Sequence, residues 1–338
     1  FCRVPPARNK PPPGARIRCT LLPVQIRLVV NPHASTTTPE RRRAVVEELS
    51  RGHTVSVAVT ERRDHATELA RAAVDEGVDA IAVLGGDGTL NEVANALVGS
   101  RVVLLALPGG GTNVFCRTLG LPDDPATAAA LLVTALSTGR TRRIGVGTID
   151  GTGLGGRDHR HFVFHTGVGW DAAVVAVVEH HSSLKRRLGH ALFIYAGVRT
   201  FFGSYDRRRP HFRLELDDGT KVHDAFFAIA MNSDPYTFVG HRPFVVDPAN
   251  SAETAFTVVV LSSMRIRHFL AVMTDALRGK GLRERPKLVL RRDVSGLTVR
   301  RTTSLPYQVD GDHLGDAAEL RMSYRPDALT VVVPEPST

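Results

Sequence analysis

The sequence GGDGT at residues 85–89 places glycines and one carboxylate directly after an apolar stretch, 80–84, and before a helical pattern. Glycines at such a turn let the backbone approach a ligand closely, and the free amides at the start of the next helix can bind phosphate oxygens. A carboxylate among those amides is understandable if Mg²⁺ or a network of donors lies between the acid and a nucleotide. The stretch therefore predicts phosphoryl transfer, with a plain strand-to-helix turn as the alternative.

A second glycine loop, PGGGTN at residues 108–113, also follows an apolar stretch and precedes a helical pattern. Two such loops at the ends of neighbouring parallel strands face one crevice, which is where open α/β sheets bind ligands. The stretch GTGLGG at 151–156 has the spacing of a dinucleotide-binding loop, but another strand pattern follows it rather than a helix. We therefore expect a hairpin loop there.

The sequence DGD at residues 310–312 carries two further carboxylates. An Asp-Gly pair is ordinary in the two-residue turn of a β-hairpin, so these residues alone favour a structural turn over a chemical site.

The elements that must position these residues fall into two groups. Strand and helix patterns alternate from residue 24 to 139, which is typical of a parallel sheet covered by helices. Short alternating strands with turn residues follow over 140–325 and predict a mainly antiparallel β domain. We therefore expect an α/β N-terminal domain and a β-rich second domain.

Some segments are less regular. Residues 1–23 are rich in Pro and Arg and lack periodicity, so we expect a disordered leader. Within the second domain the pattern predicts helices at 170–181 and 188–202 and one strand at 222–231. The final segment, 326–338, carries a strand pattern that could belong to either domain.

The composition of the 338-residue chain, 43% hydrophobic, allows two moderate cores. The net charge of +9 is scattered in short basic clusters, and aromatic residues make up 6%, so we expect no nucleic-acid partner. The same positive charge would attract the protein to an anionic membrane surface. Three widely spaced cysteines support neither a disulfide framework nor a metal site, and the fourteen histidines match no standard zinc spacing. No window approaches 18 uninterrupted apolar residues, so we expect a soluble protein.

Four separated motifs together carry a family resemblance. They are VVNPHAST at 29–36, LGGDGTLNEVANAL at 84–97, LPGGGTNVFCRTLGLP at 107–122 and QVDGDHLG at 308–315. In this order they resemble the bacterial diacylglycerol-kinase-like lipid kinases, which are related to sphingosine kinases. The resemblance implies a two-domain, ATP-dependent kinase of a lipid hydroxyl, with a fold similar to that of phosphofructokinases and NAD kinases.

The resemblance also implies roles for single residues. Asp312 resembles the general base that takes the proton from the substrate hydroxyl, and Asp87 and Asp310 complete the expected catalytic set. The expected nucleotide-binding residues are Asn31, Ser35, Thr60, Gly85, Gly86, Asp87, Gly88, Thr89, Asn91, Gly110, Gly111 and Thr112. Val114 and Phe115 stand where many relatives carry an Asp, so a role that rests on that acid is absent here.

In the second domain the resemblance places Asp171 near the lipid headgroup, and His165 replaces the usual Asn of the same stretch. A structural Mg²⁺ site of some relatives corresponds here to the carboxylate of Glu253 and the carbonyls of Asn250 and Ala255. Glu253 replaces the usual Asp, and the longer acid changes the ligand geometry.

We therefore expect an ATP- and Mg²⁺-dependent kinase of diacylglycerol or a sphingoid-type lipid. A kinase of a soluble hydroxyl acceptor, similar to NAD kinases, is the second hypothesis, and a catalytically silent nucleotide- or lipid-binding protein is the third. We expect a cytoplasmic protein that works peripherally at the inner face of a membrane and allow for a homodimer. The basic and aromatic run 185–209 is the segment expected to meet that membrane.

Overall fold

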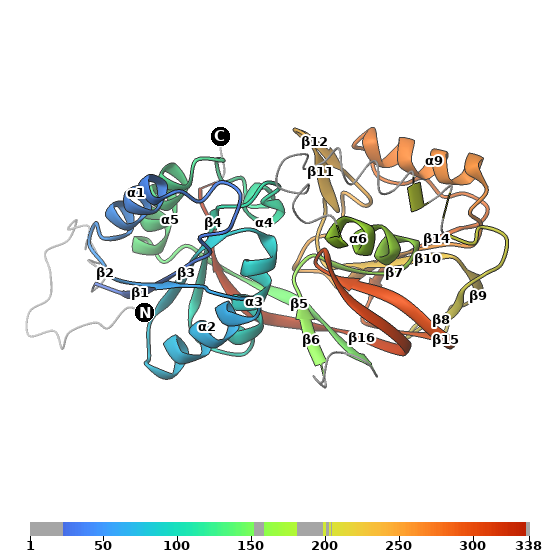
Figure 1. Cartoon of the computed structure of the whole chain (residues 1–338), viewed down its shortest axis with the longest axis horizontal. Coiled ribbons are helices and arrows are strands. Elements are labelled where there is room, and N and C mark those ends of the chain that lie inside the picture. The colour runs from blue at the N-terminus through green and yellow to red at the C-terminus, as the bar shows by residue number, and fades with distance from the viewer. Residues whose placement is uncertain (1–22, 152–158, 181–198, 201–202, 204, 336–338) are drawn as a thin grey trace, which may run out of the picture.

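The computed structural model describes residues 23–151, 159–180, 199–200, 203 and 205–335. Figure 1 shows two lobes of the chain joined by two long strands, β5 (Thr141–Gly151) and β16 (Asp312–Val332). The predicted leader, apart from Pro23, and nearly all of the predicted helix at 188–202 lie outside the described residues. The same holds for most of the loop at 151–156, although β5 and β6 (His159–Phe162) on either side of it pair antiparallel.

The first lobe is a parallel sheet covered by helices. Its strands run in the order β4, β3, β1, β2, all parallel. The strands are β1 (Gln25–Val30), β2 (Thr54–Val59), β3 (Ala80–Gly85) and β4 (Val103–Pro108). The helices are α1 (Pro39–Leu49), α2 (His65–Asp75), α3 (Asp87–Leu97), α4 (Val114–Thr118) and α5 (Pro125–Ser137). Strand β3 is buried along its whole length, which explains its uninterrupted apolar sequence.

Local signals in the sequence set the helix ends in this lobe. Thr38 caps α1 by accepting the N–H of Arg41, and a proline follows it as the first helical residue. Asp124 caps α5 in the same way, again directly before a proline. Helix α3 begins at Asp87, two residues earlier than the pattern predicted. This earlier start places the carboxylate of the glycine loop in the first turn of the helix.

The second lobe is mainly antiparallel. Its order β14, β13, β10, β7, β15, β16 continues into the parallel strands of the first lobe through β4, so one twisted sheet runs through both lobes. These strands are β7 (His165–Gly169), β10 (Phe227–Met231), β13 (Phe256–Leu261), β14 (Leu288–Val294) and β15 (Gly296–Val309). A hairpin of β8 (Phe212–Leu216) and β9 (Lys221–Ala225) pairs with β15, and β11 (Thr237–Val239) pairs only with β12 (Arg242–Phe244).

Two helices, α6 (Trp170–His180) and α9 (Ile266–Leu277), lie beside this sheet in Figure 1. The single strand predicted at 222–231 was wrong: it divides at Phe226 into β9 and β10. The division follows from pairing, because β9 joins β8 while β10 lies between β7 and β13.

The end of the chain returns to the first lobe. Val331 pairs in parallel with Leu104 of β4, and Leu329 and Val332 belong to the hydrophobic core of the first lobe. A register shift between Arg325 and Leu329 interrupts the pairing of β16 with β5 at this point. The long strand β16 therefore serves the second lobe with its first part and the first lobe with its last residues.

Candidate active site

The two glycine loops pack backbone against backbone. A methyl group added at Gly109 would lie 2.7 Å from the nitrogen of Gly85, and one added at Gly110 would lie 2.7 Å from the Cα of Gly86. The N–H of Gly109 also donates to the carbonyl of Gly85 at 2.9 Å. Glycine is therefore required at these positions by loop packing itself, and that packing brings both loops to one side of a cavity.

Asp87 holds the two loops together. Its carboxylate accepts the N–H of Val114 at 3.0 Å and of Phe115 at 3.2 Å, so it caps the start of α4. The sequence interpretation placed this acid on a turn where no cap requires its charge, and that part was wrong. The acid is attracted to the exposed amides and positive end of a short helix that lies 27 residues further along the chain.

The expected nucleotide-binding residues divide into those that line the cavity and those that support it. The lining residues among them are Asn31, Thr60, Gly86, Asp87, Gly88, Thr89, Gly110, Gly111 and Thr112. Asn31 donates from its side chain to the hydroxyl of Thr89 at 2.9 Å, which joins the first loop to α3. Ser35 supports Gly111, since its Oγ would lie 3.4 Å from a methyl group added there.

Asn91 and Gly85 do not line this cavity, which differs from their expected role in nucleotide binding. Asn91 is fully buried, and its side-chain amide donates to Asp310 at 2.7 Å and to the carbonyl of His161 at 3.0 Å. Arg160 donates to the Asn91 amide oxygen at 3.0 Å. Asn91 thus joins α3 of the first lobe to the second lobe beneath the cavity floor.

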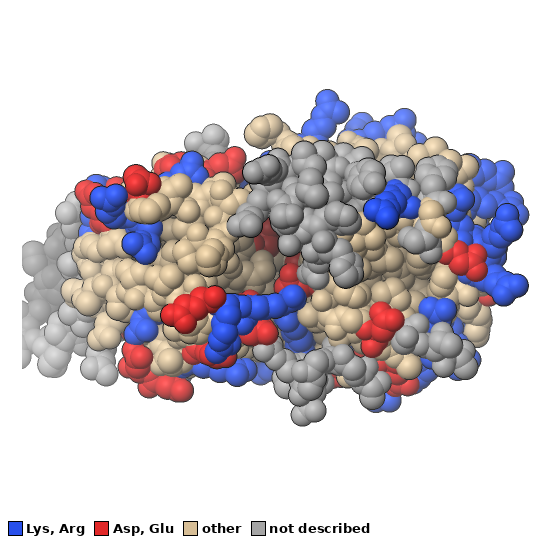
Figure 2. Space-filling model, viewed as in Figure 1, with Lys and Arg blue, Asp and Glu red and all other residues tan. Residues whose placement is uncertain are grey.

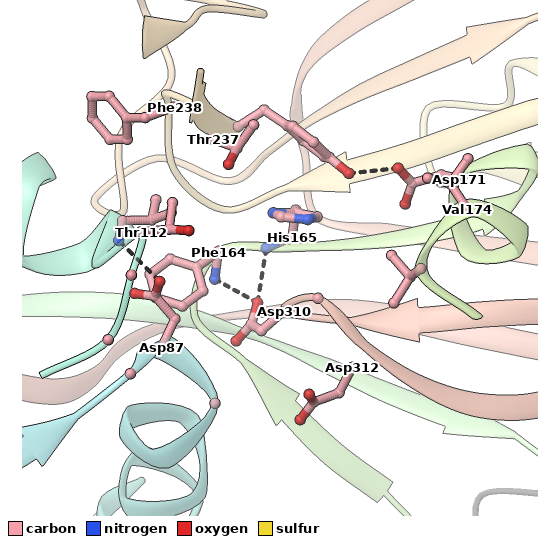
Figure 3. Close-up of a pocket in the computed structure, with 18 of the residues that line it drawn as sticks. Asp87, Thr112, Phe164, His165, Asp171, Val174, Thr237, Phe238, Asp310 and Asp312 are labelled. Atoms are coloured by element: carbon pink, nitrogen blue, oxygen red, sulfur yellow. Dashed lines mark hydrogen bonds between the residues drawn. The ribbon is translucent and has the colours of Figure 1, made fainter. Parts of the chain in front are cut away.

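The DGD stretch forms a type I′ turn between β15 and β16. Asp310 has φ of 49° and Gly311 has φ of 84°, and Val309 pairs with Asp312 across the turn. The predicted hairpin is therefore present. It orients two neighbouring acids in different directions, and Figure 3 shows their carboxylates apart.

Asp310 is a buried hub of hydrogen bonds. Its carboxylate accepts the backbone N–H groups of Val163, Phe164 and His165 at 2.8–3.0 Å, besides the amide of Asn91. Burial raises the pKa of Asp310 to about 6, although these donors oppose the shift. The sequence interpretation counted Asp310 among the catalytic acids. Its four donors hold the turn against both lobes, which supports a positioning role; Asp310 also lines the cavity, and its catalytic role stays a prediction.

Asp312 points toward the glycine loops. Its Oδ2 would lie 3.7 Å from a methyl group added at Gly88 in the first turn of α3. Arg63 and Arg160 each place a guanidinium nitrogen 3.6 Å from the same oxygen. The carboxylate is partly exposed and lines the cavity, so it is open to a bound group and lies beside two cations.

The sequence interpretation missed both arginines. Arg63 lies three residues after Thr60, just beyond the end of β2. Ligands bind at this edge of a parallel sheet, so the position of Arg63 was a signal that could have identified it. Arg160 belongs to β6, and nothing in its sequence neighbourhood indicates that it contacts α3.

Asp171 is the centre of a second buried network. Tyr236 donates its hydroxyl to Asp171, and Gln308 donates its side-chain amide at 2.7 Å. The amide oxygen of Gln308 in turn accepts the N–H of Gly311 at 2.8 Å. Gln308, which sequence reasoning did not single out, therefore links Asp171 to the turn that presents Asp312.

The groups around Asp171 are packed closely and shielded from water. A methyl group at Gly167 would lie 1.7 Å from an Asp171 oxygen, so only glycine fits there. Burial raises the pKa of Asp171, and it lowers the pKa of His165, which replaces the usual Asn, to about 3. The buried imidazole of His165 lies 4.1 Å from the Tyr236 ring by ring centroids, with the two planes tilted by 36°.

One cavity of about 990 Å³ connects these parts. Its polar end is formed by the glycine loops, Arg62, Arg63 and Asp312. Its other end is lined by apolar side chains of α6, β10, β11 and α9: Trp170, Val174, Val175, Phe227, Ile229, Phe238, Ile266, Phe269, Leu270, Met273 and Leu277. In Figure 3, Asp87 and Thr112 lie on one side, Asp171 and Val174 on the other, and Asp310 between them. Figure 2 shows acidic side chains within the hollow between the lobes and basic ones along its lower rim.

The loop expected to hold a structural Mg²⁺ is occupied by other contacts. Glu253 is half exposed and lies 3.1 Å from the guanidinium of Arg142, and the Asn250 amide donates to the carbonyl of Met231 at 3.2 Å. Among the described residues, no group of three or more His, Cys, Asp or Glu is placed to hold a metal ion. The expected site has one carboxylate and two backbone carbonyls, so the role of Asn250, Glu253 and Ala255 in holding Mg²⁺ stays a prediction.

No helix in the described part of the chain combines the length and the apolar character needed to cross a membrane.

Comparisons with known proteins agree with this geometry. A model of the diacylglycerol kinase catalytic domain matches residues 25–149, and a model of the YegS C-terminal NAD kinase beta sandwich-like domain matches residues 165–333. A diacylglycerol kinase of Staphylococcus aureus (strain bovine RF122 / ET3-1) is 27% identical over 268 residues, covering 78% of each chain. A crystal structure of a diacylglycerol kinase from Bacillus anthracis superposes with a TM-score of 0.66 at 19% identity, covering 92% of this chain and 97% of that one.

Fold, site and comparisons together define a phosphotransferase with an alcohol group as acceptor. The chain belongs to the diacylglycerol-kinase-like lipid kinases of bacteria, with a catalytic domain followed by the second domain of that family. The predicted family, the two-domain fold class and the kinase class are confirmed. Membership implies the use of ATP.

Proposed function

We propose that the protein transfers the γ-phosphoryl group of ATP to the hydroxyl of a lipid of the diacylglycerol or sphingoid type. One observation carries this proposal: a single cavity joins the glycine loops to an apolar chamber, and Asp312 lines that cavity beside Gly88 of the glycine loop. A hydroxyl and a phosphoryl donor could therefore approach one another beside a carboxylate, with water displaced by the walls of the cavity.

The polar end suits the triphosphate. Gly86, Gly88 and Gly110 offer backbone without side chains, and the first turn of α3 lines the cavity, where a helix N-terminus favours phosphate oxygens. Arg63 lies at the same end and can balance the negative charge of the phosphates. Mg²⁺ would supply further charge neutralisation when bound with ATP, and Asp312 and the hydroxyl of Thr89 are the lining oxygen ligands that suit it.

Asp312 is proposed as the general base. The acceptor oxygen loses its proton to the Asp312 carboxylate as it bonds to the γ-phosphorus, while the bond from that phosphorus to the β-phosphate bridging oxygen breaks and ADP leaves. Arg63, 3.6 Å from the carboxylate and lining the cavity, can stabilise charge on the transferred group, while the buried Arg160 lies at the same distance and can orient the carboxylate.

The apolar end favours a lipid over a soluble acceptor. Aromatic and aliphatic side chains from three different elements, such as Trp170, Phe227 and Met273, line it, and such a wall offers few hydrogen bonds to a nicotinamide or sugar. Asp171 and Tyr236 also line the cavity, which suits contacts with a lipid headgroup.

The test is phosphorylation of a panel of acceptors with labelled ATP: diacylglycerol, a sphingoid base, ceramide, glycerol and NAD. Labelled diacylglycerol or sphingoid product that disappears in the Asp312→Asn variant is the expected result. Labelling of NAD alone would favour the soluble-acceptor hypothesis. Tight ATP binding without turnover of any acceptor would favour the silent binding protein.

Several finer expectations belong to the same proposal and await their own measurements. We expect the protein to act on the cytoplasmic side of a membrane surface and to assemble as a homodimer. The basic and aromatic run 185–209 that was expected to meet the membrane lies largely outside the described residues.

A further inference from the structure

Helix α9 has an apolar face that is exposed in the described part of the chain. Of the six large hydrophobic side chains exposed in the described part of the chain, Ile266, Leu270 and Leu277 lie on this one helix, exposed by 47%, 54% and 45%. Their spacing of four and seven residues places them on one side of the helix. Val272 and Ala276 on another side are buried against the protein body, so the helix is anchored while the apolar face stays outside.

The exposed face lies at the cavity. Ile266, Leu270 and Leu277 all line the apolar chamber, together with Phe269 and Met273 of the same helix. A surface that is both exposed and continuous with an acyl-chain chamber is the place where a lipid would enter. Such a cluster of large apolar side chains is unusual on a soluble surface unless something binds there.

Charge around the helix identifies what binds. From residue 265 to 287 the chain carries seven Lys or Arg and two acids. Arg265 and Arg267 stand at the start of α9, and Arg278 and Lys280 follow its end, all exposed. Figure 2 shows basic side chains along the upper right edge, where α9 lies in Figure 1.

Of the two acids only Glu284 is exposed, so the seven cations leave the segment strongly basic at the surface. Asp275 is 2% exposed and lies 3.2 Å or less from the guanidinium of Arg285, with Arg278 and Arg283 also near. An apolar face between two groups of exposed cations has the arrangement of an interfacial helix on an anionic lipid surface.

We propose that α9 docks the protein on anionic membranes by inserting Ile266, Leu270 and Leu277 among the lipids, while Arg265, Arg267, Arg278 and Lys280 contact the headgroups. This inference rests on the proposed function for its purpose, since docking in this orientation would open the apolar chamber to the bilayer. In this proposal α9 is both a wall of the acceptor site and the helix that anchors the protein to the membrane.

The test is co-sedimentation without ATP. The vesicles contain phosphatidylglycerol and phosphatidylcholine in equal parts, with phosphatidylcholine alone for comparison. The protein should sediment with the anionic vesicles at low salt and be released as salt rises. Leu270→Ser should weaken binding at least about tenfold, because a buried Leu side chain is lost from the membrane. The matched control is Leu131→Ser on α5, another exposed leucine, which should bind as the unchanged protein does.

Charge is tested separately. Arg267→Glu should weaken binding at least about fivefold, whereas Arg43→Glu on the distant α1 should not. Equal binding of the unchanged protein and Leu270→Ser, both folded by circular dichroism, would overturn the insertion, as would equal sedimentation with neutral and anionic vesicles.

A kinase assay distinguishes failure of docking from failure of the proposed function. Arg267→Glu should phosphorylate a dispersed short-chain diacylglycerol at the unchanged rate but lose turnover of diacylglycerol held in anionic vesicles. Turnover of the dispersed acceptor without any vesicle binding would overturn docking and leave the function intact. Vesicle binding through α9 without phosphorylation of any lipid would support docking and overturn the function.

Discussion

The two ends of the cavity are built in different ways. At the polar end the wall is backbone: Gly109 and Gly110 pack against Gly85 and Gly86 with no space for a methyl group. At the apolar end the wall is side chains of α6, β10 and α9, and several of these remain partly exposed. The difference teaches where change is tolerated. The backbone wall is proposed to bind the triphosphate, which stays the same for every acceptor, so it admits little variation. The side-chain wall can change to fit a different acceptor.

Asp312 lines the cavity beside the glycine loop, and its replacement should have the largest effect. Asp312→Asn preserves size but removes the proton acceptor, so kcat should fall by about 10²- to 10⁴-fold while ATP affinity changes little. Asp312→Glu extends the carboxylate by one methylene and should keep partial activity if the site tolerates the small displacement. The rates are measured with the acceptor identified by the panel. A folded Asn variant that works at the full rate would remove Asp312 from the chemistry.

The backbone wall is tested by Gly110→Ala. The added methyl group would lie 2.7 Å from the Cα of Gly86, so the loops must separate and the KM for ATP should rise by about tenfold or more. Gly296→Ala at the start of β15 is the control, because its nearest neighbour would be 3.5 Å away. If both variants bind ATP equally well, the loop packing does not shape the nucleotide site.

The hub between the ends is tested by Asp310→Asn. The amide would turn an N–H group toward backbone donors, so the variant should be less stable by about 1–3 kcal/mol. The pH dependence gives a second readout. In the folded protein the pKa of Asp310 is about 6, which is higher than its unfolded value of about 4. Protonation of this acid therefore adds most to the free energy of unfolding below about pH 4, and this addition is lost as the pH rises through about 6.

Urea unfolding at a series of pH values measures both effects of this hub. The Asn variant should lose the decline between pH 4 and 6 that this acid contributes. An unchanged pH profile together with unchanged stability would contradict the assignment of Asp310 as the hub.

The side-chain wall should respond most mildly. Met273→Ala enlarges the chamber and removes apolar contact, so the KM for the lipid acceptor should rise several-fold while the KM for ATP stays the same. The comparison is made within one variant, with both constants measured in the same assay. A rise in the ATP KM of equal size would mean that the two ends are not separate.

The corrected role of Asp87 limits what a mutation there can show. Its carboxylate caps α4, so Asp87→Asn should cost about 1 kcal/mol of stability in addition to any loss of rate. A loss of activity in this variant would therefore not by itself place the acid on a metal or a phosphate.

The sequence by itself determined much of the first lobe. Apolar strands, prolines after the capping Thr38 and Asp124, and glycines after β3 and β4 act on their immediate neighbours, and such local signals can be recognised without the fold. The motif order also indicated the family and the candidate base at Asp312.

Only the tertiary structure decided which polar residues meet. Asp310 accepts hydrogen bonds from Asn91, 219 residues away, and from the backbone 145–147 residues away. Gln308 reaches Asp171 over 137 residues, and Arg160 reaches Asp312 from a strand whose own sequence shows no sign of it. Local patterns specify strands, turns and caps because those depend on nearby residues. The division of DGD into a buried hub and an open acid depends instead on strands from both lobes closing around one turn.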